Sequence, residues 1–302
     1  MPMTNSIPTL ATALKRYPTT EALLSGKLTL PAFHFDFHEV EPIHDVFKPM
    51  AREQRYDVSE LAIFTFLQAY AYNKPIVLLP MVLASRFQHG CIVYNTDYNK
   101  ELTPDMLPGK KIGVRAYTQT TGAWVRNILS QEHALDFESV EWIIFEGSHL
   151  AEYTEPSFVK RAAPGVKLLP MLMAGEIDAG ILGNDLPNDP KIKPVIPDAA
   201  NAGRAWHDKT GLIPINHMLV VKRDLLRFRP DLVRDVYKTF KQAKETVTVA
   251  PGAIDMRPIG YDKVTPSLEL AIQLAYEQQI IPRRFSVDEL FAESRAVLGD
   301  LA

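Results

Sequence analysis

The chain is poor in cysteine and has no excess of basic residues. Cys91 is its single cysteine, so neither an intramolecular disulfide nor a zinc site made of cysteine pairs can form. The 33 lysine and arginine residues are outnumbered by 36 aspartate and glutamate residues, which gives a formal net charge of −3. A nucleic-acid-binding protein needs a basic surface, so we expect no nucleic-acid partner.

Long apolar runs are also missing. No stretch approaches the ~20 apolar residues that span a bilayer. The N-terminal segment lacks the basic start and apolar run of an export signal. We therefore expect a cytoplasmic protein with no membrane partner, and we leave open whether it forms a homo-oligomer. The length of 302 residues, 46% of them hydrophobic, is sufficient for two lobes with large cores.

Motifs for nucleotide, nucleophile and metal chemistry are absent from the sequence. It contains no Gly-x-Gly-x-x-Gly fingerprint, no Walker-type loop, no Gly-x-Ser-x-Gly elbow and no His-Glu-x-x-His pair. His34 and His38 come closest to metal spacing, but residues four apart on a strand are separated by ~13 Å. We expect no cofactor and no metal, although ligands distant in sequence leave a metal site open.

Strand-like and helix-like segments alternate along the chain, which is typical of an α/β fold. The pattern restarts near Leu107, and a late strand leads into long C-terminal helices. We predict a first lobe formed by residues 1–97 and 217–302 and a second lobe formed by residues 98–216. Two crossings, near Asn95–Asn99 and Pro214–Met218, would join the lobes beside a central ligand cleft. A one-piece doubly wound sheet is the alternative, because periodicity does not determine topology.

The segment Lys110–Leu129, KKIGVRAYTQTTGAWVRNIL, predicts a strand over 111–114, a hydroxyl-rich turn and an amphipathic helix. Arg115 follows the strand, and three threonines stand where the helix begins: Thr118, Thr120 and Thr121. A helix N-terminus carries unpaired N–H groups and a partial positive charge, and an arginine can bind a carboxylate through two hydrogen bonds. The segment therefore indicates a site for a short organic anion. The competing interpretation is that the threonines are ordinary helix caps and Arg115 is a solvated charge.

Four stretches carry a resemblance to a known family. They are YDVSELAIFTFLQAYAYNKPIVLLPMVLASRFQHGCIVYN, GKKIGVRAYTQTTGAWVRNIL, MLMAGEIDAGIL and PINHMLVV. Together they resemble the type II periplasmic-binding-protein fold and, more closely, the 4,5-dihydroxyphthalate decarboxylases of phthalate breakdown. The motifs DVSE, SRFQH and VRAYTQTTGAWVR are the more specific part of this similarity.

The resemblance implies a metal-independent enzyme that removes CO2 from a dihydroxylated aromatic dicarboxylic acid. For 4,5-dihydroxyphthalate the product is 3,4-dihydroxybenzoate. A substrate with two adjacent carboxylates needs more than one cation or helix N-terminus. We expect Arg86, which follows an apolar strand, and Arg115 with its threonine turn to bind these carboxylates from opposite lobes. Either arginine by itself is more often part of a surface ion pair.

Decarboxylation of an electron-rich ring also needs a proton donor and acceptors for the hydroxyl groups. We expect Glu60, just after a strand at a helix N-terminus, to accept from a hydroxyl, and Ser59 to cap that helix or contact the substrate. Histidine suits the acid or base role, because its ordinary pKa lies near working pH. Three of the eight histidines stand at suitable places: His217, His89 and His149. We rank His217 first, because it lies at the second crossing, and His89 second.

A function from a different class is the runner-up. A non-catalytic solute-binding protein for an aromatic or dicarboxylic acid would use the same fold and the same anion site. The absence of an export signal favours the enzyme. In either case we expect the two lobes to close on the ligand, as hinged binding folds do.

Overall fold

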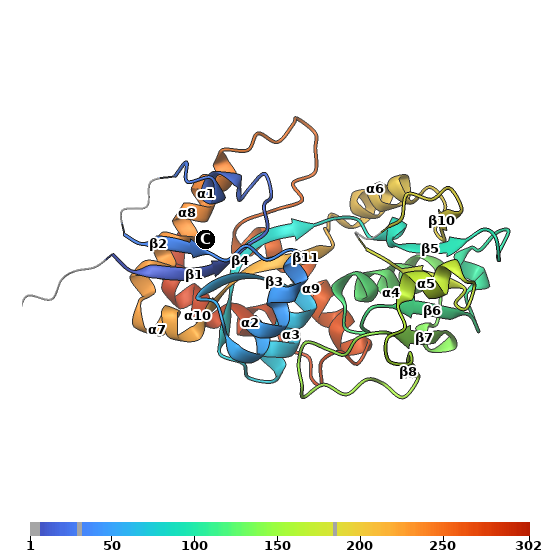
Figure 1. Ribbon diagram of the computed structural model, residues 1–302. Coiled ribbons are helices and arrows are strands. Elements are labelled where there is room, and N and C mark those ends of the chain that lie inside the picture. The colour runs from blue at the N-terminus through green and yellow to red at the C-terminus, as the bar shows by residue number, and fades with distance from the viewer. Residues whose placement is uncertain (1–6, 29–31, 184–185) are drawn as a thin grey trace, which may run out of the picture. The chain divides into compact units, whose positions relative to one another are not determined.

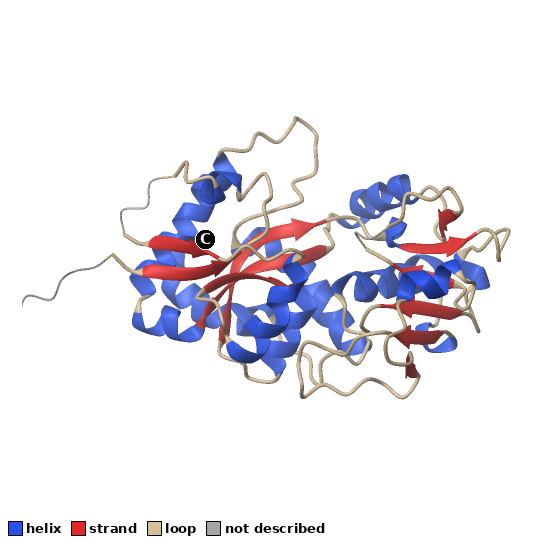
Figure 2. Ribbon diagram, viewed as in Figure 1, coloured by secondary structure: helices blue, strands red, loops and turns tan. Residues whose placement is uncertain are grey.

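The computed structural model describes residues 7–28, 32–183 and 186–302 of the chain. It divides into two compact units (Figure 1). Unit 1 comprises Met1–Ser85, Ile215–Ile272 and Arg283–Ala302, and unit 2 comprises Arg86–Pro214 and Gln273–Pro282. Each unit has its own β-sheet flanked by helices (Figure 2), so the predicted α/β class is confirmed.

The unit boundaries differ from the predicted ones in two respects. The first boundary follows Ser85 instead of lying at Asn95–Asn99, so Arg86 is grouped with unit 2 and not with the first lobe as expected. The second boundary follows Pro214. Helix α9 (Tyr261–Glu277) is divided after Ile272, and the chain returns to unit 1 at Arg283. No break in the apolar periodicity of the helix marks this return, so it could not be predicted from the sequence.

Unit 1 contains, among its described residues, a five-stranded sheet in the order β2-β1-β3-β11-β4. Strands β1, β2 and β3 run parallel, and β11 lies antiparallel to both β3 and β4. Pro80 does not interrupt β4, because β4 is an edge strand in which a missing N–H is tolerated. The strand bounds are Thr9–Ala13 (β1), His34–Phe37 (β2), Val58–Ala62 (β3), Ile76–Ser85 (β4) and Ile215–Lys222 (β11).

Helices cover this sheet with faces predicted by their apolar spacing. In α8 the buried side chains include Leu232, Val236 and Phe240, which follow the helical repeat. Helix α10 packs on β4, whereas α2 and α3 contact β3. The helix bounds are Glu21–Leu24 (α1), Phe47–Glu53 (α2), Ile63–Ala71 (α3), Arg223–Phe228 (α7), Pro230–Glu245 (α8) and Val287–Leu298 (α10). Short 3-10 turns occupy Ile43–Val46 (η1) and Gly299–Leu301 (η5).

Unit 2 contains a six-stranded sheet in the order β10-β5-β9-β6-β7-β8 within the part of the chain that the structure describes. Strands β9, β6, β7 and β8 are parallel, and β5 is antiparallel to β9. The strand bounds are Ile92–Asn95 (β5), Lys111–Val114 (β6), Glu141–Ile144 (β7), Val159–Arg161 (β8), Ala179–Ile181 (β9) and Ile192–Pro194 (β10). The helices are Thr120–His133 (α4), Leu168–Met173 (α5) and Ala199–Thr210 (α6), with 3-10 turns at His89–Cys91 (η2), Pro104–Met106 (η3) and Phe137–Ser139 (η4).

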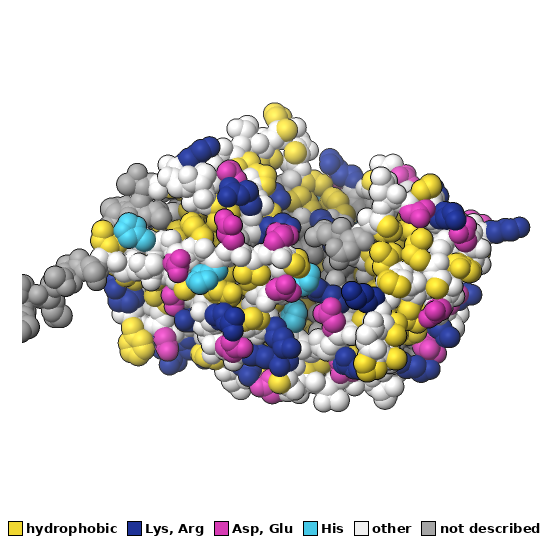
Figure 3. All heavy atoms as spheres, viewed as in Figure 1, with side chains coloured by type: hydrophobic (Ala, Val, Ile, Leu, Met, Phe, Trp, Pro, Cys, Tyr) yellow, Lys and Arg dark blue, Asp and Glu magenta, His cyan; other side chains and the backbone are white. Residues whose placement is uncertain are grey.

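Two strand glycines explain why α5 lies close to the unit 2 sheet. A Cβ atom on Gly113 would approach Ile177 to 2.7 Å, and one on Gly180 would approach Leu168 to 2.9 Å. The missing side chains let Leu168 and Leu172 pack directly on the strands, where they form a core cluster with Val93. Hydrophobic side chains gather on the outer surface around α5 (Figure 3). Throughout the described ranges, no helix has the length and apolar character needed to cross a membrane.

Candidate functional site

The carboxyl ends of the parallel strands β9, β6 and β7 meet at one edge of the unit 2 sheet. Val114, the last residue of β6, is in register with Ile181 of β9 and Ile144 of β7. The antiparallel strand β5 starts at this same edge, because Ile92 pairs with Ile181. Arg115 and Gly183 follow two of these strands, and Arg86 precedes β5. Topology therefore gathers these residues at the edge where α/β proteins usually bind ligands.

The N-terminus of α4 at this edge is not capped by a side chain. Its N-cap residue is Gln119, which makes no capping hydrogen bond through its side chain. The Oγ1 atom of Thr120 and the Oε1 atom of Gln119 are both buried, and neither has a hydrogen-bond partner. Thr118 and Thr121 are buried as well. The cap interpretation of the threonines is therefore wrong, and the Thr120 hydroxyl group remains available to a ligand at a positive helix end.

Two arginines accompany this helix end. Arg86 donates from Nη2 to Thr121 Oγ1 over 3.3 Å and from Nε to Gln88 Oε1 over 3.3 Å. The Nε atom of Arg115 is buried and makes no hydrogen bond, and it lies 3.8 Å from a carboxylate oxygen of Glu146. The Glu146 side chain is 59% exposed, so this ion pair is weak. Arg115 keeps an unpaired Nε–H that can bind an anion, and both arginines belong to unit 2.

Gly183 is a member of this site that the sequence analysis did not identify. Its backbone has a φ of +64°, and a Cβ atom there would lie 3.1 Å from Arg86 Nη2 and 3.7 Å from Thr121 Oγ1. A side chain at this position would be strained and would crowd the arginine. The available signal was a glycine directly after the strand segment GEIDAGIL, at the ligand-binding edge of the sheet.

The His89 side chain pairs with a residue near the C-terminal end of α4, although His89 follows Arg86 by only three residues. Its side chain is fully buried, with Nε2 3.0 Å from Glu132 Oε1 near the other end of α4. Eleven residues separate Glu132 from Thr121, which corresponds to ~16 Å along the helix. His149 follows β7 in an irregular segment, and His207, which sequence patterns did not place, lies in α6. The His207 ring lies 6.2 Å from the ring of Phe87, the residue that follows Arg86.

Unit 1 holds a second cluster of predicted residues, formed where β3 and β11 pair. Glu60 is opposite Leu219 in the antiparallel register, so His217, two residues away, shares its face of the sheet. The Nδ1 atom of His217 lies 2.8 Å from Glu60 Oε1. Glu60 is fully buried, whereas the His217 side chain is 19% exposed. The pair is a carboxylate–imidazole dyad with one ring nitrogen committed to the carboxylate.

Two further donors fix the Glu60 carboxylate. Tyr17 donates its hydroxyl to Oε1 over 2.9 Å, and the backbone N–H of Lys15 donates to Oε2 over 2.7 Å. Burial, together with the negative charge of Glu60, raises the pKa of Tyr17 far above its ordinary value. The phenol therefore stays protonated and keeps donating. Phe47 packs edge-on against the imidazole ring, with 4.9 Å between ring centroids, and limits its rotation.

The local structure around Ser59 and Glu60 differs from the prediction. Both residues lie within strand β3, and α3 begins later, at Ile63, with Ala62 as its N-cap. The run Val58–Ala62 is buried throughout, which favours a central strand. Ser59 is fully buried, caps no helix and donates its hydroxyl to the Glu60 carbonyl. Successive strand residues face opposite sides, so the Ser59 and Glu60 side chains do not share a face.

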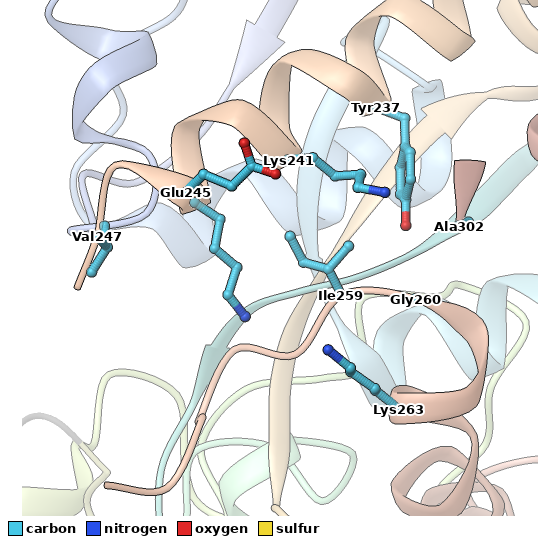
Figure 4. Close-up of a pocket in the computed structure, with 9 residues that line it drawn as sticks. Tyr237, Lys241, Glu245, Val247, Ile259, Gly260, Lys263 and Ala302 are labelled. Atoms are coloured by element: carbon cyan, nitrogen blue, oxygen red, sulfur yellow. The ribbon is translucent and has the colours of Figure 1, made fainter. Parts of the chain in front are cut away.

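A separate pocket lies in unit 1 beside α8 (Figure 4). It has a volume of about 350 Å3 and is lined partly by Tyr237, Lys241, Lys244 and Lys263. Lys244 is paired with Asp255 at 2.6 Å, and Lys241 donates to the Leu301 carbonyl. None of the residues predicted to act on the substrate lines it. In the described part of the chain, no three His, Cys, Asp or Glu side chains are grouped to hold a metal ion.

Comparison with known proteins identifies related sequences. No protein-family model matches the chain. A 4,5-dihydroxyphthalate decarboxylase of Comamonas testosteroni is 25% identical over 254 residues, which are 78% of this chain and 74% of that protein. A protein of the same name from Pseudomonas putida is 26% identical over 213 residues, which are 66% of this chain and 81% of that protein.

Solved structures show the same fold at low sequence identity. The alkanesulfonate-binding protein SsuA from Xanthomonas axonopodis pv. citri superposes with a TM-score of 0.59 and 12% identity, over 93% of this chain and 97% of that one. The periplasmic aliphatic sulphonate binding protein SsuA from Escherichia coli superposes with a TM-score of 0.56 and 13% identity, over 93% of this chain and 96% of that one. The desulfurization enzyme DSZB superposes with a TM-score of 0.55 and 16% identity, over 98% of this chain and 100% of that one. In sequence the chain is thus similar to the 4,5-dihydroxyphthalate decarboxylases, and its fold is the α/β fold of type II periplasmic binding proteins.

Proposed function

We propose that the protein is a carboxy-lyase that converts 4,5-dihydroxyphthalate to 3,4-dihydroxybenzoate and CO2. The sequence similarity to two decarboxylases supports this reaction. The observation that carries it is the Glu60–His217 dyad with Tyr17, because it supplies an oriented acid–base group. A receptor that only binds its solute has no use for such a group.

Unit 2 supplies the anion-binding function. A phthalate-type substrate carries two neighbouring carboxylates, and the edge of the unit 2 sheet offers several groups to bind them. These are the guanidinium groups of Arg86 and Arg115 and the uncapped N-terminus of α4, with the Thr118, Thr120 and Thr121 hydroxyl groups.

The dyad supplies the proton. His217 in its protonated form donates from Nε2 to the ring carbon that bears the departing carboxylate, while Nδ1–H stays hydrogen-bonded to Glu60. The hydroxyl para to that carbon releases electrons into the ring and stabilises the cationic intermediate. The C–C bond then breaks, CO2 leaves, and the bonding electrons restore aromaticity. His217 is the catalytic residue in this scheme and takes up a new proton from water. Glu60 positions its ring and stabilises the imidazolium ion.

Incubation with 4,5-dihydroxyphthalate tests the proposal. We expect release of one CO2 and formation of one monocarboxylic product for each substrate consumed. In D2O the product should carry one deuterium on the ring carbon that lost the carboxylate, because the proton comes from an exchangeable group. Saturable binding without CO2 release would contradict the proposal and favour the solute-binding alternative.

The reaction is also proposed to need no metal ion. We expect activity to survive dialysis against a strong chelator, since the proposed steps use side chains only. Loss of activity on chelation, restored by one divalent ion, would contradict this part of the proposal.

A further inference from the structure

Arg126 is a buried charge that the proposed reaction does not use. Its side chain extends from α4 back toward the start of the helix and is only 1% exposed. Nη2 donates to the Tyr117 carbonyl over 2.6 Å, and Nε donates to Gln278 Oε1 over 2.7 Å. Neither acceptor carries a negative charge, and Nη1 is buried without a hydrogen-bond partner.

The guanidinium group has aromatic neighbours in place of a carboxylate. It lies 4.0 Å from the centre of the Tyr117 ring and 5.3 Å from that of Trp142. Burial lowers the pKa of Arg126, and the groups that act on it electrostatically are tyrosines. No ion pair joins it to a carboxylate within the described residues. A buried charge without a counter-ion is unfavourable for folding, so its retention calls for a further role.

The position of Arg126 relates this charge to the anion site. Tyr117, whose carbonyl it holds, directly precedes Thr118 in the turn that leads into α4. Nη1 lies 3.4 Å from where a Cβ atom on Gly122 would be, in the first turn of the helix. The guanidinium charge therefore lies behind the N-terminal turn and adds to the positive potential of the helix end.

We propose that Arg126 is a positioning residue that makes the α4 anion site selective for doubly charged ligands, and that the bound dianion compensates its charge. This rests on the proposed function only in taking an aromatic dicarboxylate as ligand. A monocarboxylate is held by the hydroxyl groups and one arginine, and gains less from the additional buried charge. Removing that charge weakens binding of the dianion more than binding of the monoanion.

Gln278 allows the charge to be neutralised without removing the arginine. In the variant Gln278→Glu a carboxylate stands beside Arg126 Nε. At pH 8 we expect its Kd for phthalate, measured by calorimetry, to rise about tenfold or more, and its Kd for benzoate to change by less than about threefold. Gln131→Glu is the matched control: it makes the same substitution on the exposed far end of α4, and both Kd values should stay within about twofold of wild type.

A second variant guards against misfolding. Arg126→Lys keeps the charge but loses the fork that holds Tyr117 and Gln278, so it should lower the Tm while keeping the ratio of the two Kd values. The inference would be overturned if folded Gln278→Glu kept the wild-type ratio of the benzoate Kd to the phthalate Kd. It would also be overturned if that ratio fell in Arg126→Lys. Phthalate and benzoate are not turned over, so these titrations are independent of decarboxylation. Loss of selectivity in a protein that releases no CO2 would refute the proposed function alone.

Discussion

The two units differ in how their buried charged side chains are paired. In unit 1 the fully buried carboxylate of Glu60 receives hydrogen bonds from Tyr17, from the Lys15 backbone and from His217. In unit 2 the buried guanidinium group of Arg126 has only uncharged acceptors, and Arg115 Nε has no acceptor. The Glu60 charge is thus satisfied within unit 1, whereas Arg126 has no carboxylate partner among the described residues.

In the proposed reaction, this difference separates proton donation from anion binding. The proposed proton donor, His217, must be held in one orientation before the substrate binds. Glu60 holds its ring, and the Glu60 carboxylate is itself fixed by hydrogen bonds from Tyr17 and from the Lys15 backbone. An anion gains most from donors that are not already paired, such as Arg115 Nε and Arg126 Nη1. The comparison therefore predicts that substitutions in unit 1 reduce turnover and that substitutions in unit 2 reduce binding.

The largest effect is expected in unit 1. His217→Asn removes the proposed proton donor, and Glu60→Gln removes the carboxylate that orients its ring. Each should reduce kcat by about 10²–10⁴. The Kd of phthalate should stay within about twofold of wild type, because the anion site belongs to unit 2.

Tyr17→Phe provides a graded control for the unit 1 variants. It removes one of the donors to Glu60 and should reduce kcat less than either variant above. Far-ultraviolet circular dichroism and steady-state kinetics check all three proteins. If Glu60→Gln weakened phthalate binding as strongly as it reduced kcat, the separation of tasks would be refuted.

The next largest effect is expected for the two arginines of the anion site. Arg86→Ala and Arg115→Ala should each raise the Kd of phthalate by about 10–100-fold, since a charge-assisted contact is lost from a partly buried site. The matched control is Arg204→Ala in α6, whose side chain is 54% exposed and pairs with Asp208. Wild-type kcat/KM in both site variants would show that the arginines do not bind the substrate.

A smaller effect is expected at Gly183. The Gly183→Ala variant places a methyl group against Arg86, and we expect KM to rise about 3–10-fold with an additional loss of stability of about 1 kcal/mol. Gly109→Ala is a close control, because its φ of +76° imposes the same strain while no atom lies within 4 Å of the added carbon. Equal KM values in the two variants would remove Gly183 from the site.

Alkaline pH should distinguish the units by stability. Burial raises the pKa of Tyr17, Tyr237 and Tyr261 in unit 1, and of Tyr117 in unit 2. A raised pKa favours the neutral form in the folded state, so this stabilisation is complete below pH ~10 and is lost as the pH rises further.

The tryptophans allow this loss to be followed in one unit. All three, Trp124, Trp142 and Trp206, belong to unit 2, so their fluorescence reports on that unit alone. Urea unfolding between pH 8 and 11 should show the midpoint from circular dichroism falling before the midpoint from fluorescence. Midpoints that fall together at every pH would argue against a difference between the units.

The sequence predicted the secondary structure around the anion site well, because several local signals agree there. The strand over 111–114 and the helix that begins at Thr120 were both found. Arg115 stands at the strand end as expected. Alternative interpretations of the threonines could be separated only by the structure, since a hydroxyl group at a helix start is compatible with capping and with ligand binding alike.

Sequence reasoning was less successful where tertiary structure decides. Glu60 was predicted at a helix start, because Ser59 resembles an N-cap, but burial in the centre of the sheet makes Val58–Ala62 a strand. The pairing of Glu60 with His217 joins residues 157 positions apart and leaves no local signal. Arg126 was overlooked for a similar reason: an arginine in an amphipathic helix is usually solvated, and only the packed structure shows it buried.

The division of helix α9 between the two units has a consequence for how this protein is made. Unit 2 needs residues 273–282, where Gln278 holds both Arg126 and the Ala123 carbonyl, so it cannot be completed when residue 214 is synthesised. Its assembly waits until most of the chain has been synthesised, and unit 1 is completed by the following segment, Arg283–Ala302. A fragment of residues 86–214 should therefore fold poorly, whereas adding residues 273–282 through a short linker should restore it.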